Sequence, residues 1–168
     1  MNYNLEILSS EQLKTLKELV NRSLTNPTNP QLGSVDEYQQ STTFFKPDSN
    51  KELSNFINNI TGYTIPQINS LFYITYNEGD KLPVHRDRRN PSIKQNPDHS
   101  ISYSFLLDMC EEGGEFLVDN TDVNFKLPGQ YLWFDGWDIL HEIKEVKKGQ
   151  RWIFDNLDKK CKDRTHYK

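Results

Sequence analysis

The sequence has little cysteine, no excess of positive charge and no long apolar run, and each shortage excludes a class of protein. Only two cysteines occur among the 168 residues, Cys110 and Cys161, so a disulfide framework is excluded, and neither has the close Cys/His spacing of a zinc site. The net charge of -4 argues against a general nucleic-acid-binding protein. No uninterrupted apolar run approaches the ~18 residues that a membrane span requires.

The start of the chain has no basic segment followed by an apolar core, so we expect no signal peptide. Together with the low cysteine content, this predicts a soluble protein of the reducing cytoplasm. A chain of 168 residues is long enough to bury a real core as one domain, and its 12% aromatic content indicates a core rich in Phe, Tyr and Trp.

Three potential metal ligands stand at the ends of apolar segments. The apolar run 71–76 leads through a turn into a short extended segment that ends in His85 and Asp87. In a strand, residues i and i+2 point to the same face, so these two side chains can converge on one point. His141 follows a second apolar run, 129–134, and a polar turn. Two histidines and one carboxylate on one face of an ion are typical of the facial triad of non-haem Fe(II) oxygenases.

A fourth residue, Arg151, lies ten residues after His141 in another apolar segment. A turn over 147–150, with Gly149 supplying a permissive backbone, predicts that the strand holding His141 folds back against the strand holding Arg151. An inward guanidinium on a strand is costly unless it meets an anion, and its planar fork suits a carboxylate better than Lys would. The four residues together predict iron and a dicarboxylate co-substrate.

With this ordered set, the sequence resembles the 2-oxoglutarate- and Fe(II)-dependent dioxygenases, particularly the prolyl-4-hydroxylase-like branch. The matching segments occur in the family's order and cover roughly residues 71–156, about half of the chain. They are residues 76–79, residues 85–87, the strand candidate 100–108, residues 113–116, residues 129–134, His141 and residues 149–151.

The resemblance implies that His85, Asp87 and His141 bind Fe(II) and that Arg151 binds the far carboxylate of 2-oxoglutarate, with O2 consumed and ascorbate as reductant. It further implies hydroxylation of a peptidyl proline, coupled to decarboxylation of 2-oxoglutarate to succinate. A free amino acid or a small metabolite is the alternative substrate. Because related halogenases leave the carboxylate position open for chloride, Asp87 favours hydroxylation.

The rest of the co-substrate pocket is expected on two strands. In the family a Tyr near this position hydrogen-bonds the co-substrate, which makes Tyr76 a candidate. Ser102 and Ser104 share a strand face with Leu106 and are candidates for the same pocket, although a Tyr found in several family members is missing at Leu106. Tyr103 is expected to face the opposite way.

Substrate contacts are expected from Arg86, Arg88, Arg89 and Trp137. The irregular segment 88–98 is expected either to fold over substrate or to form a surface loop. The expected partner is a proline-containing peptide or protein, with no nucleic acid and no membrane.

Several alternatives remain open. His99 is a rival third ligand, His166 is expected in a solvated terminus, and Arg151 could instead form an ion pair with Glu142 or Asp155. The chain could also be a non-catalytic jelly-roll binding module, or a metal-dependent isomerase of the cupin type, which would not need Arg151.

The expected fold is mainly β with flanking N-terminal helices, a double-stranded β-helix (jelly roll, cupin-like). Helices are predicted from a capping box at 9–12 to about residue 23, and from a second capping box at 49–52. Residues 1–70 are a helical support region, 71–157 the catalytic core and 158–168 a polar tail. Strands are predicted at 4–8 and 41–46, and then, without intervening helices, at 71–76, 82–87, 100–108, 114–118, 123–127, 130–134, 139–145 and 151–156.

Overall fold

The structure is a computed structural model, and it describes residues 2–26, 31–32, 41–62, 68–87, 101–136, 138–149 and 151–158. The N-terminal elements are β1 (Asn4–Ile7), α1 (Ser10–Leu24), β2 (Gln31–Leu32), β3 (Ser41–Phe45), the 3-10 helix η1 (Pro47–Ser49) and α2 (Lys51–Thr61). The strands that follow are β4 (Ile68–Tyr76), β5 (Leu82–His85), β6 (Ile101–Asp108), β7 (Glu112–Gly113), β8 (Phe116–Val118), β9 (Thr121–Asp122), β10 (Gln130–Asp135), β11 (His141–Ile143), β12 (Val146–Lys148) and β13 (Arg151–Asp158).

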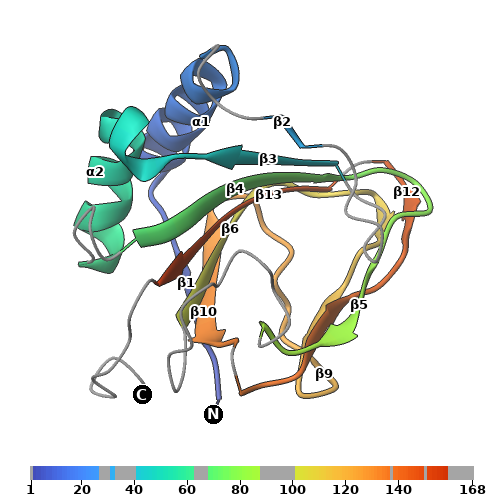
Figure 1. The fold of residues 1–168 in the computed structure, drawn as a ribbon. Helices are drawn as coiled ribbons and strands as arrows, with labels where there is room; N and C mark the ends of the chain where they lie inside the picture. Colours follow the sequence, from blue (N-terminus) through green and yellow to red (C-terminus); the bar gives the residue numbers. More distant parts are fainter. Residues whose placement is uncertain are drawn as a thin grey trace.

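Two antiparallel sheets form the body of the molecule, as Figure 1 shows. The larger sheet has seven strands in the order β1-β10-β6-β13-β4-β3-β2, and the smaller sheet has four in the order β5-β11-β8-β9. Strands β12 and β7 form a separate two-stranded ribbon. The N-terminal region therefore supplies three strands to the larger sheet as well as both helices. No helix in the described part of the chain is long and apolar enough to cross a membrane.

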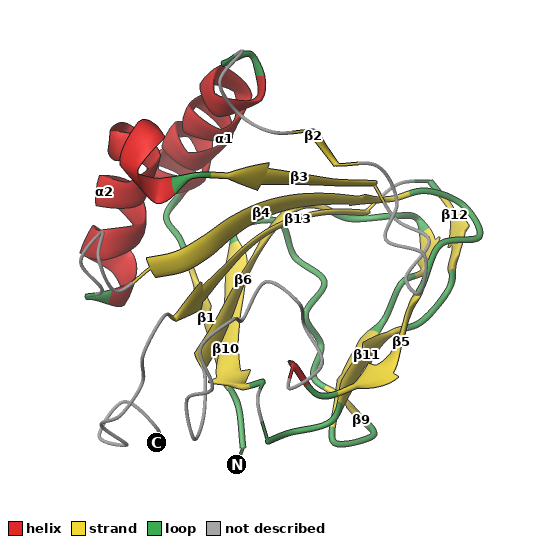
Figure 2. Cartoon of the chain, in the orientation of Figure 1, coloured by secondary structure: helices red, strands yellow, loops and turns green. Residues whose placement is uncertain are grey.

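Both helices cover the face of the larger sheet that points away from the smaller sheet (Figure 2). Helix α1 begins at the predicted capping box, because the Ser9 hydroxyl accepts from the Gln12 N–H at 3.1 Å and the Gln12 side chain accepts from the Ser9 N–H at 2.8 Å. The helices and the sheet bury an outer core of Leu8, Leu16, Leu19, Val20, Phe45, Leu53, Ile57, Leu71, Ile101, Tyr103, Phe105 and Leu107.

A second, inner core fills the space between the two sheets. It contains Phe72, Ile74, Tyr76, Leu106, Cys110, Phe116, Val118, Val123, Phe125, Leu132, Phe134, Ile143 and Val146. Strand β6 separates the two cores, since Tyr103 packs in the outer core and Leu106 in the inner one. With the period of two that a strand imposes, Ser102 and Ser104 share the inner face with Leu106, as predicted.

Two local predictions are wrong. The second capping box does not form: Asn50 is the N-cap of α2, makes no side-chain capping bond, and instead donates through Nδ2 to the Lys46 carbonyl at 2.8 Å. Residues 123–127 are not a strand, although Val123 and Phe125 alternate as buried residues.

The reason for the missing strand is that side chains take its backbone N–H groups. The Asn124 N–H donates to Asp122 Oδ1 at 2.8 Å, and the N–H groups of Lys126 and Leu127 both donate to Gln130 Oε1 at 2.9 Å. Asn124 also has a φ of 58°, which no strand accommodates. The alternation in this segment therefore marks a loop that buries two side chains, Val123 and Phe125.

Candidate metal centre

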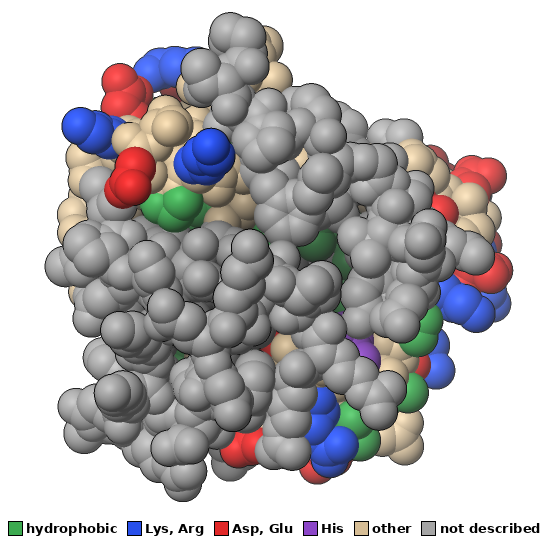
Figure 3. All heavy atoms as spheres, viewed as in Figure 1, with side chains coloured by type: hydrophobic (Ala, Val, Ile, Leu, Met, Phe, Trp, Pro, Cys, Tyr) green, Lys and Arg blue, Asp and Glu red, His purple; other side chains and the backbone are tan. Residues whose placement is uncertain are grey.

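Three side chains predicted as metal ligands lie together beside the inner core, where the His141 ring contacts those of Phe116 and Phe134. Among the residues that the structure describes, one group of potential metal ligands occurs, formed by His85, Asp87 and His141. Their ligand atoms all lie within 4.8 Å of one another. The carboxylate and the second imidazole are both 5% exposed. The His85 side chain is 15% exposed, and a histidine is visible in purple among the surface atoms in Figure 3.

The smaller sheet brings the two histidines together. His85 ends β5 and His141 begins β11, and the two are direct partners in the antiparallel pair β5–β11. Asp87 lies two residues beyond the end of β5, so the predicted strand 82–87 is too long by two residues. Its backbone N–H instead donates to the Gly136 carbonyl at 2.8 Å, which holds it beside the histidines.

Backbone carbonyls orient both imidazoles. His85 Nδ1 lies 2.7 Å from the Pro83 carbonyl oxygen, and His141 Nδ1 lies 3.0 Å from that of Ile139. Because a carbonyl oxygen only accepts hydrogen bonds, each Nδ1 carries a proton and each Nε2 is left to bind either a proton or a metal ion. The Nε2 atoms of His85 and His141 lie 3.4 Å and 3.2 Å from Asp87 Oδ1, so both face one carboxylate oxygen.

The Asp87 carboxylate is held as an anion. Burial alone raises the pKa of Asp87, but the charge of His141 and hydrogen bonds from His141 and His85 outweigh it and bring the pKa well below its ordinary range. The other carboxylate oxygen, Oδ2, accepts a 2.7 Å hydrogen bond from the Ser102 hydroxyl. Oδ1 therefore remains directed at the two histidines.

This donor set fits Fe(II). Two imidazole nitrogens and one carboxylate oxygen converge from one side, which leaves further positions on an ion open. The Nδ1–H bonds to carbonyl oxygens are the usual means by which proteins orient metal-binding histidines. The fit to Fe(II) depends on the orientation of the two Nε2 atoms, which the spacing of the residues in the sequence does not determine.

The structure places Arg151 beside Tyr76. Arg151 begins β13, and its backbone pairs directly with that of Tyr76 at the end of β4. Tyr76 is only 1% exposed and belongs to the inner core. The two predicted co-substrate residues are thus neighbours across two strands of the larger sheet.

The predicted hairpin between the strands of His141 and Arg151 is wrong. Strand β11 pairs with β5 and β8 in the smaller sheet, whereas β13 pairs with β4 and β6 in the larger one. The chain crosses between the sheets at Gly149, which has a φ of 87° and whose N–H donates to Glu78 Oε1 at 3.2 Å. The crossing occurs because β12 pairs with β7. This pairing directs the chain away from β11 before the turn at Gly149.

The remaining predicted residues fall in different places. Ser104 is buried, at 4% exposure, on the inner face of β6. Arg86 is exposed, and its Nε donates to the Asp138 carbonyl at 2.8 Å. Several predicted features lie outside the described residues. They are the substrate residues Arg88, Arg89 and Trp137, the alternative ligand His99, the loop 88–98, and residues 159–168 of the polar tail with His166.

Sequence reasoning missed Gly136, whose carbonyl accepts from the Asp87 N–H and whose Cα lies against the carboxylate. The signal available was weak: a glycine two residues after the apolar run of β10. It also missed Pro83 and Ile139, because the backbone carbonyls that orient the imidazoles have no side-chain signature.

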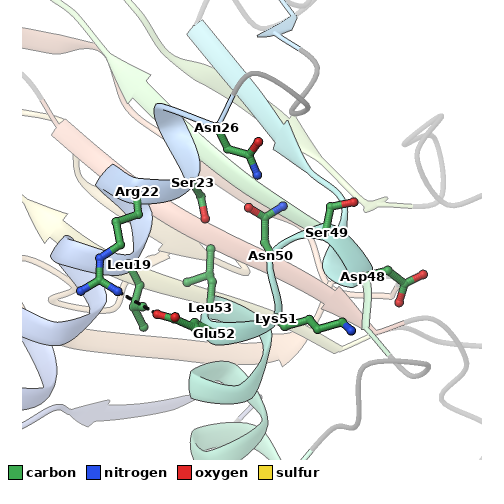
Figure 4. Close-up of a pocket in the computed structure, with 10 residues that line it drawn as sticks. All are labelled: Leu19, Arg22, Ser23, Asn26, Asp48, Ser49, Asn50, Lys51, Glu52 and Leu53. Carbon is green, nitrogen blue, oxygen red and sulfur yellow. Dashed lines mark hydrogen bonds and ion pairs between the residues drawn. The ribbon is translucent and has the colours of Figure 1, made fainter.

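A cavity of about 440 Å³ lies elsewhere, between the end of α1 and the start of α2 (Figure 4). The exposed ion pair between Arg22 and Glu52, 2.8 Å apart, closes one side of it. Its lining mixes both signs of charge with amides and hydroxyls and includes none of the predicted site residues.

No protein-family model matches the sequence, and no curated protein matches it either. Solved structures match the fold over most of the chain. The viral collagen prolyl hydroxylase of Paramecium Bursaria Chlorella virus-1, in a 2-oxoglutarate complex, superposes with a TM-score of 0.67 at 17% identity, over 94% of this chain and 96% of that chain.

Two further structures show how widely the fold is used. A prolyl hydroxylase from Trichoplax adhaerens, in complex with a peptide of the hypoxia inducible factor oxygen degradation domain, has a TM-score of 0.62 and 16% identity, over 94% of this chain and 83% of that chain. An epimerase in complex with Fe3+, α-ketoglutarate and nogalamycin RO has a TM-score of 0.64 and 9% identity, over 94% of this chain and 78% of that chain.

The chain has the fold of the 2-oxoglutarate- and Fe(II)-dependent oxygenases. The predicted double-stranded β-helix is thereby confirmed. In this oxygenase fold, the His85, Asp87 and His141 group lies on the smaller sheet and the loop beside it, and the backbone of Arg151 lies on the larger sheet.

Proposed function

We propose that this protein is an Fe(II)- and 2-oxoglutarate-dependent dioxygenase. The observation that carries the proposal is the convergence of two Nε2 atoms on one oxygen of a buried carboxylate. His85, His141 and Asp87 Oδ1 would hold Fe(II), and the bound iron with 2-oxoglutarate supplies the oxidising chemistry. The protein's own part is to fix these three ligands and to exclude water from the inner core.

Arg151 is the proposed partner of the far carboxylate of 2-oxoglutarate. Its support is its place in the chain: it pairs directly with Tyr76, whose side chain lies in the inner core that the metal ligands border. A guanidinium binds a carboxylate through two parallel hydrogen bonds, which orients a dicarboxylate as well as binding it. Tyr76 and Ser104 are proposed as further pocket residues, since both are buried on the inner side of the larger sheet.

The proposed substrate is a peptidyl proline that is hydroxylated as 2-oxoglutarate is decarboxylated to succinate. Prolyl hydroxylases are among the structures that share the fold, and one of them holds a peptide. A small metabolite is the second candidate, favoured by the similarity to an epimerase that holds nogalamycin RO. Arg86, Arg88, Arg89 and Trp137 stay proposed substrate contacts.

The test is succinate release from 2-oxoglutarate with Fe(II) and ascorbate, without substrate and with a panel of proline-rich peptides, free proline and single-stranded DNA. Stimulation by a proline peptide supports both the enzyme class and the substrate. Turnover that no member of the panel increases supports the enzyme class and rejects the proline substrate. No turnover together with no metal-dependent binding of 2-oxoglutarate rejects the oxygenase and favours a binding module.

A further inference from the structure

We infer that Ser102 and Gly136 are positioning residues that select which oxygen of Asp87 binds the metal ion. This inference rests on the proposed function, because it concerns the same metal site. It adds two residues to the machinery of that site, one from the larger sheet and one from the loop after β10.

Ser102 acts on the oxygen that faces away from the histidines. Its hydroxyl donates to Asp87 Oδ2 at 2.7 Å, and both side chains are buried, at 6% and 5% exposure. A hydrogen bond to an ionised acceptor in such a site is roughly twice as strong as one between neutral groups. The bond fixes the rotation of the carboxylate, so Oδ1 alone faces His85 and His141.

Gly136 makes this arrangement possible by having no side chain. A Cβ atom at Gly136 would lie 2.1 Å from Asp87 Oδ2 and 2.6 Å from the Ser102 hydroxyl oxygen. Gly136 is not among the glycines with positive φ, so its backbone conformation is open to other residues. What excludes a larger residue is therefore the contact with Asp87 and Ser102.

The fold brings these three residues together by two pairings. Ser102 on β6 is the direct partner of Phe134 on β10, and the chain reaches Gly136 two residues later. The Gly136 carbonyl then accepts from the Asp87 N–H at 2.8 Å. Asp87 is thus held through its backbone by Gly136 and through Oδ2 by Ser102, and the loop that carries it is tied to the larger sheet.

The decisive experiment is calorimetric titration of Co(II) into metal-free protein, with the absorption spectrum of the bound Co(II) as a second readout. We expect Ser102→Ala and Gly136→Ala each to weaken Co(II) binding by about 10- to 100-fold, the usual loss when a residue that orients a metal ligand is replaced. We expect Ser102→Thr, which keeps the hydroxyl, to recover most of the affinity. The Co(II) spectrum of the two alanine variants should differ from that of the wild type, because the carboxylate is free to rotate in Ser102→Ala and is displaced by the added methyl group in Gly136→Ala.

Two control variants separate positioning from stability. Ser54→Ala removes a buried serine whose hydroxyl donates to the Pro47 carbonyl at 2.8 Å, far from the metal site. Gly62→Ala strains a residue with a φ of 78° but places its Cβ in open space. Both are expected to lower the melting temperature and to leave Co(II) affinity unchanged.

If the wild-type protein binds Co(II), and Ser102→Ala binds it with the same affinity and the same spectrum, the inference is overturned but the proposed metal site is not. A wild-type protein that binds no Co(II) would overturn both. If Gly136→Ala does not fold, the contrast between Ser102→Ala and Ser102→Thr decides the outcome alone.

Discussion

The two faces of strand β6 are both buried, yet they differ in chemistry. On the outer face Ile101, Tyr103, Phe105 and Leu107 pack against the helix side, and every one is apolar or aromatic. On the inner face two buried hydroxyls, those of Ser102 and Ser104, precede Leu106. Burying a hydroxyl costs free energy that a hydrogen bond must offset, and the Ser102 hydroxyl makes such a bond to Asp87.

This difference indicates where function lies in the molecule. The outer face needs only volume and hydrophobicity, and its residues can be exchanged for others of similar size. The inner face has a polar group where the Asp87 carboxylate needs a donor. Outer-face substitutions should therefore change stability, and inner-face substitutions should change binding and turnover.

The largest expected effect comes from removing the carboxylate that Ser102 orients. Asp87→Ala leaves an ion only two neutral ligands, so metal binding and succinate release should fall to background. A metal ion at a hundred times its Kd stabilises the folded state by about 2.7 kcal/mol, and this increment should vanish in a thermal melt of the variant. Glu115→Ala, at an exposed carboxylate, serves as the control. Retained metal binding in Asp87→Ala would contradict the assignment of ligands.

On the outer face, Phe105→Ala should cost about 3–5 kcal/mol of unfolding free energy. Phe105 is fully buried and stacks on Tyr131 with ring centroids 5.4 Å apart. Urea denaturation measures the loss, and Co(II) titration under folding conditions should give the wild-type affinity. A change in metal affinity of more than a few-fold would show that the two faces are coupled.

Replacing the proposed co-substrate arginine should have a smaller effect that is confined to binding. We expect Arg151→Ala to weaken 2-oxoglutarate binding by roughly 1.5–3 kcal/mol, because a charged hydrogen-bond pair is lost. Arg151→Lys should recover only part of it, since an ammonium cannot form the planar fork. Calorimetric titration of 2-oxoglutarate into the metal-loaded protein checks both, and unchanged affinity in the alanine variant would reject the role.

The smallest expected effect is that of Tyr76→Phe. The ring that fills the inner core is kept, so the unfolding free energy should change little. Loss of the hydroxyl should weaken 2-oxoglutarate binding by about 1 kcal/mol, in the same titration. An effect on stability alone would mean that Tyr76 is an ordinary core residue.

Much of the arrangement could be predicted because it depends on local patterns. The capping box at Ser9 and the alternation along β6 depend on residues close in sequence, and both are confirmed. The convergence of His85, Asp87 and His141 was also predictable, since apolar runs place the ends of strands at one edge.

The errors concern how strands pair over longer distances. The turn at Gly149 has the residues of a hairpin, but it joins strands of different sheets. The reason is that β12, which precedes the turn, pairs with β7, a strand more than thirty residues earlier in the chain. The alternation of Val123 and Phe125 has the period of a strand, but neighbouring side chains satisfy its N–H groups. The contact of Gly136 with Asp87 depends on the same long-range packing.

The crossing at Gly149 has a consequence for the size of the co-substrate. The metal ligands lie on the smaller sheet and its adjoining loop, whereas Arg151 begins a strand of the larger sheet. If Arg151 binds the far carboxylate as proposed, the co-substrate spans the gap between the sheets, and the side chains that keep the sheets apart set the chain length of the 2-oxo acid that fits. Inner-core residues such as Phe116 and Leu106 then act as determinants of co-substrate length.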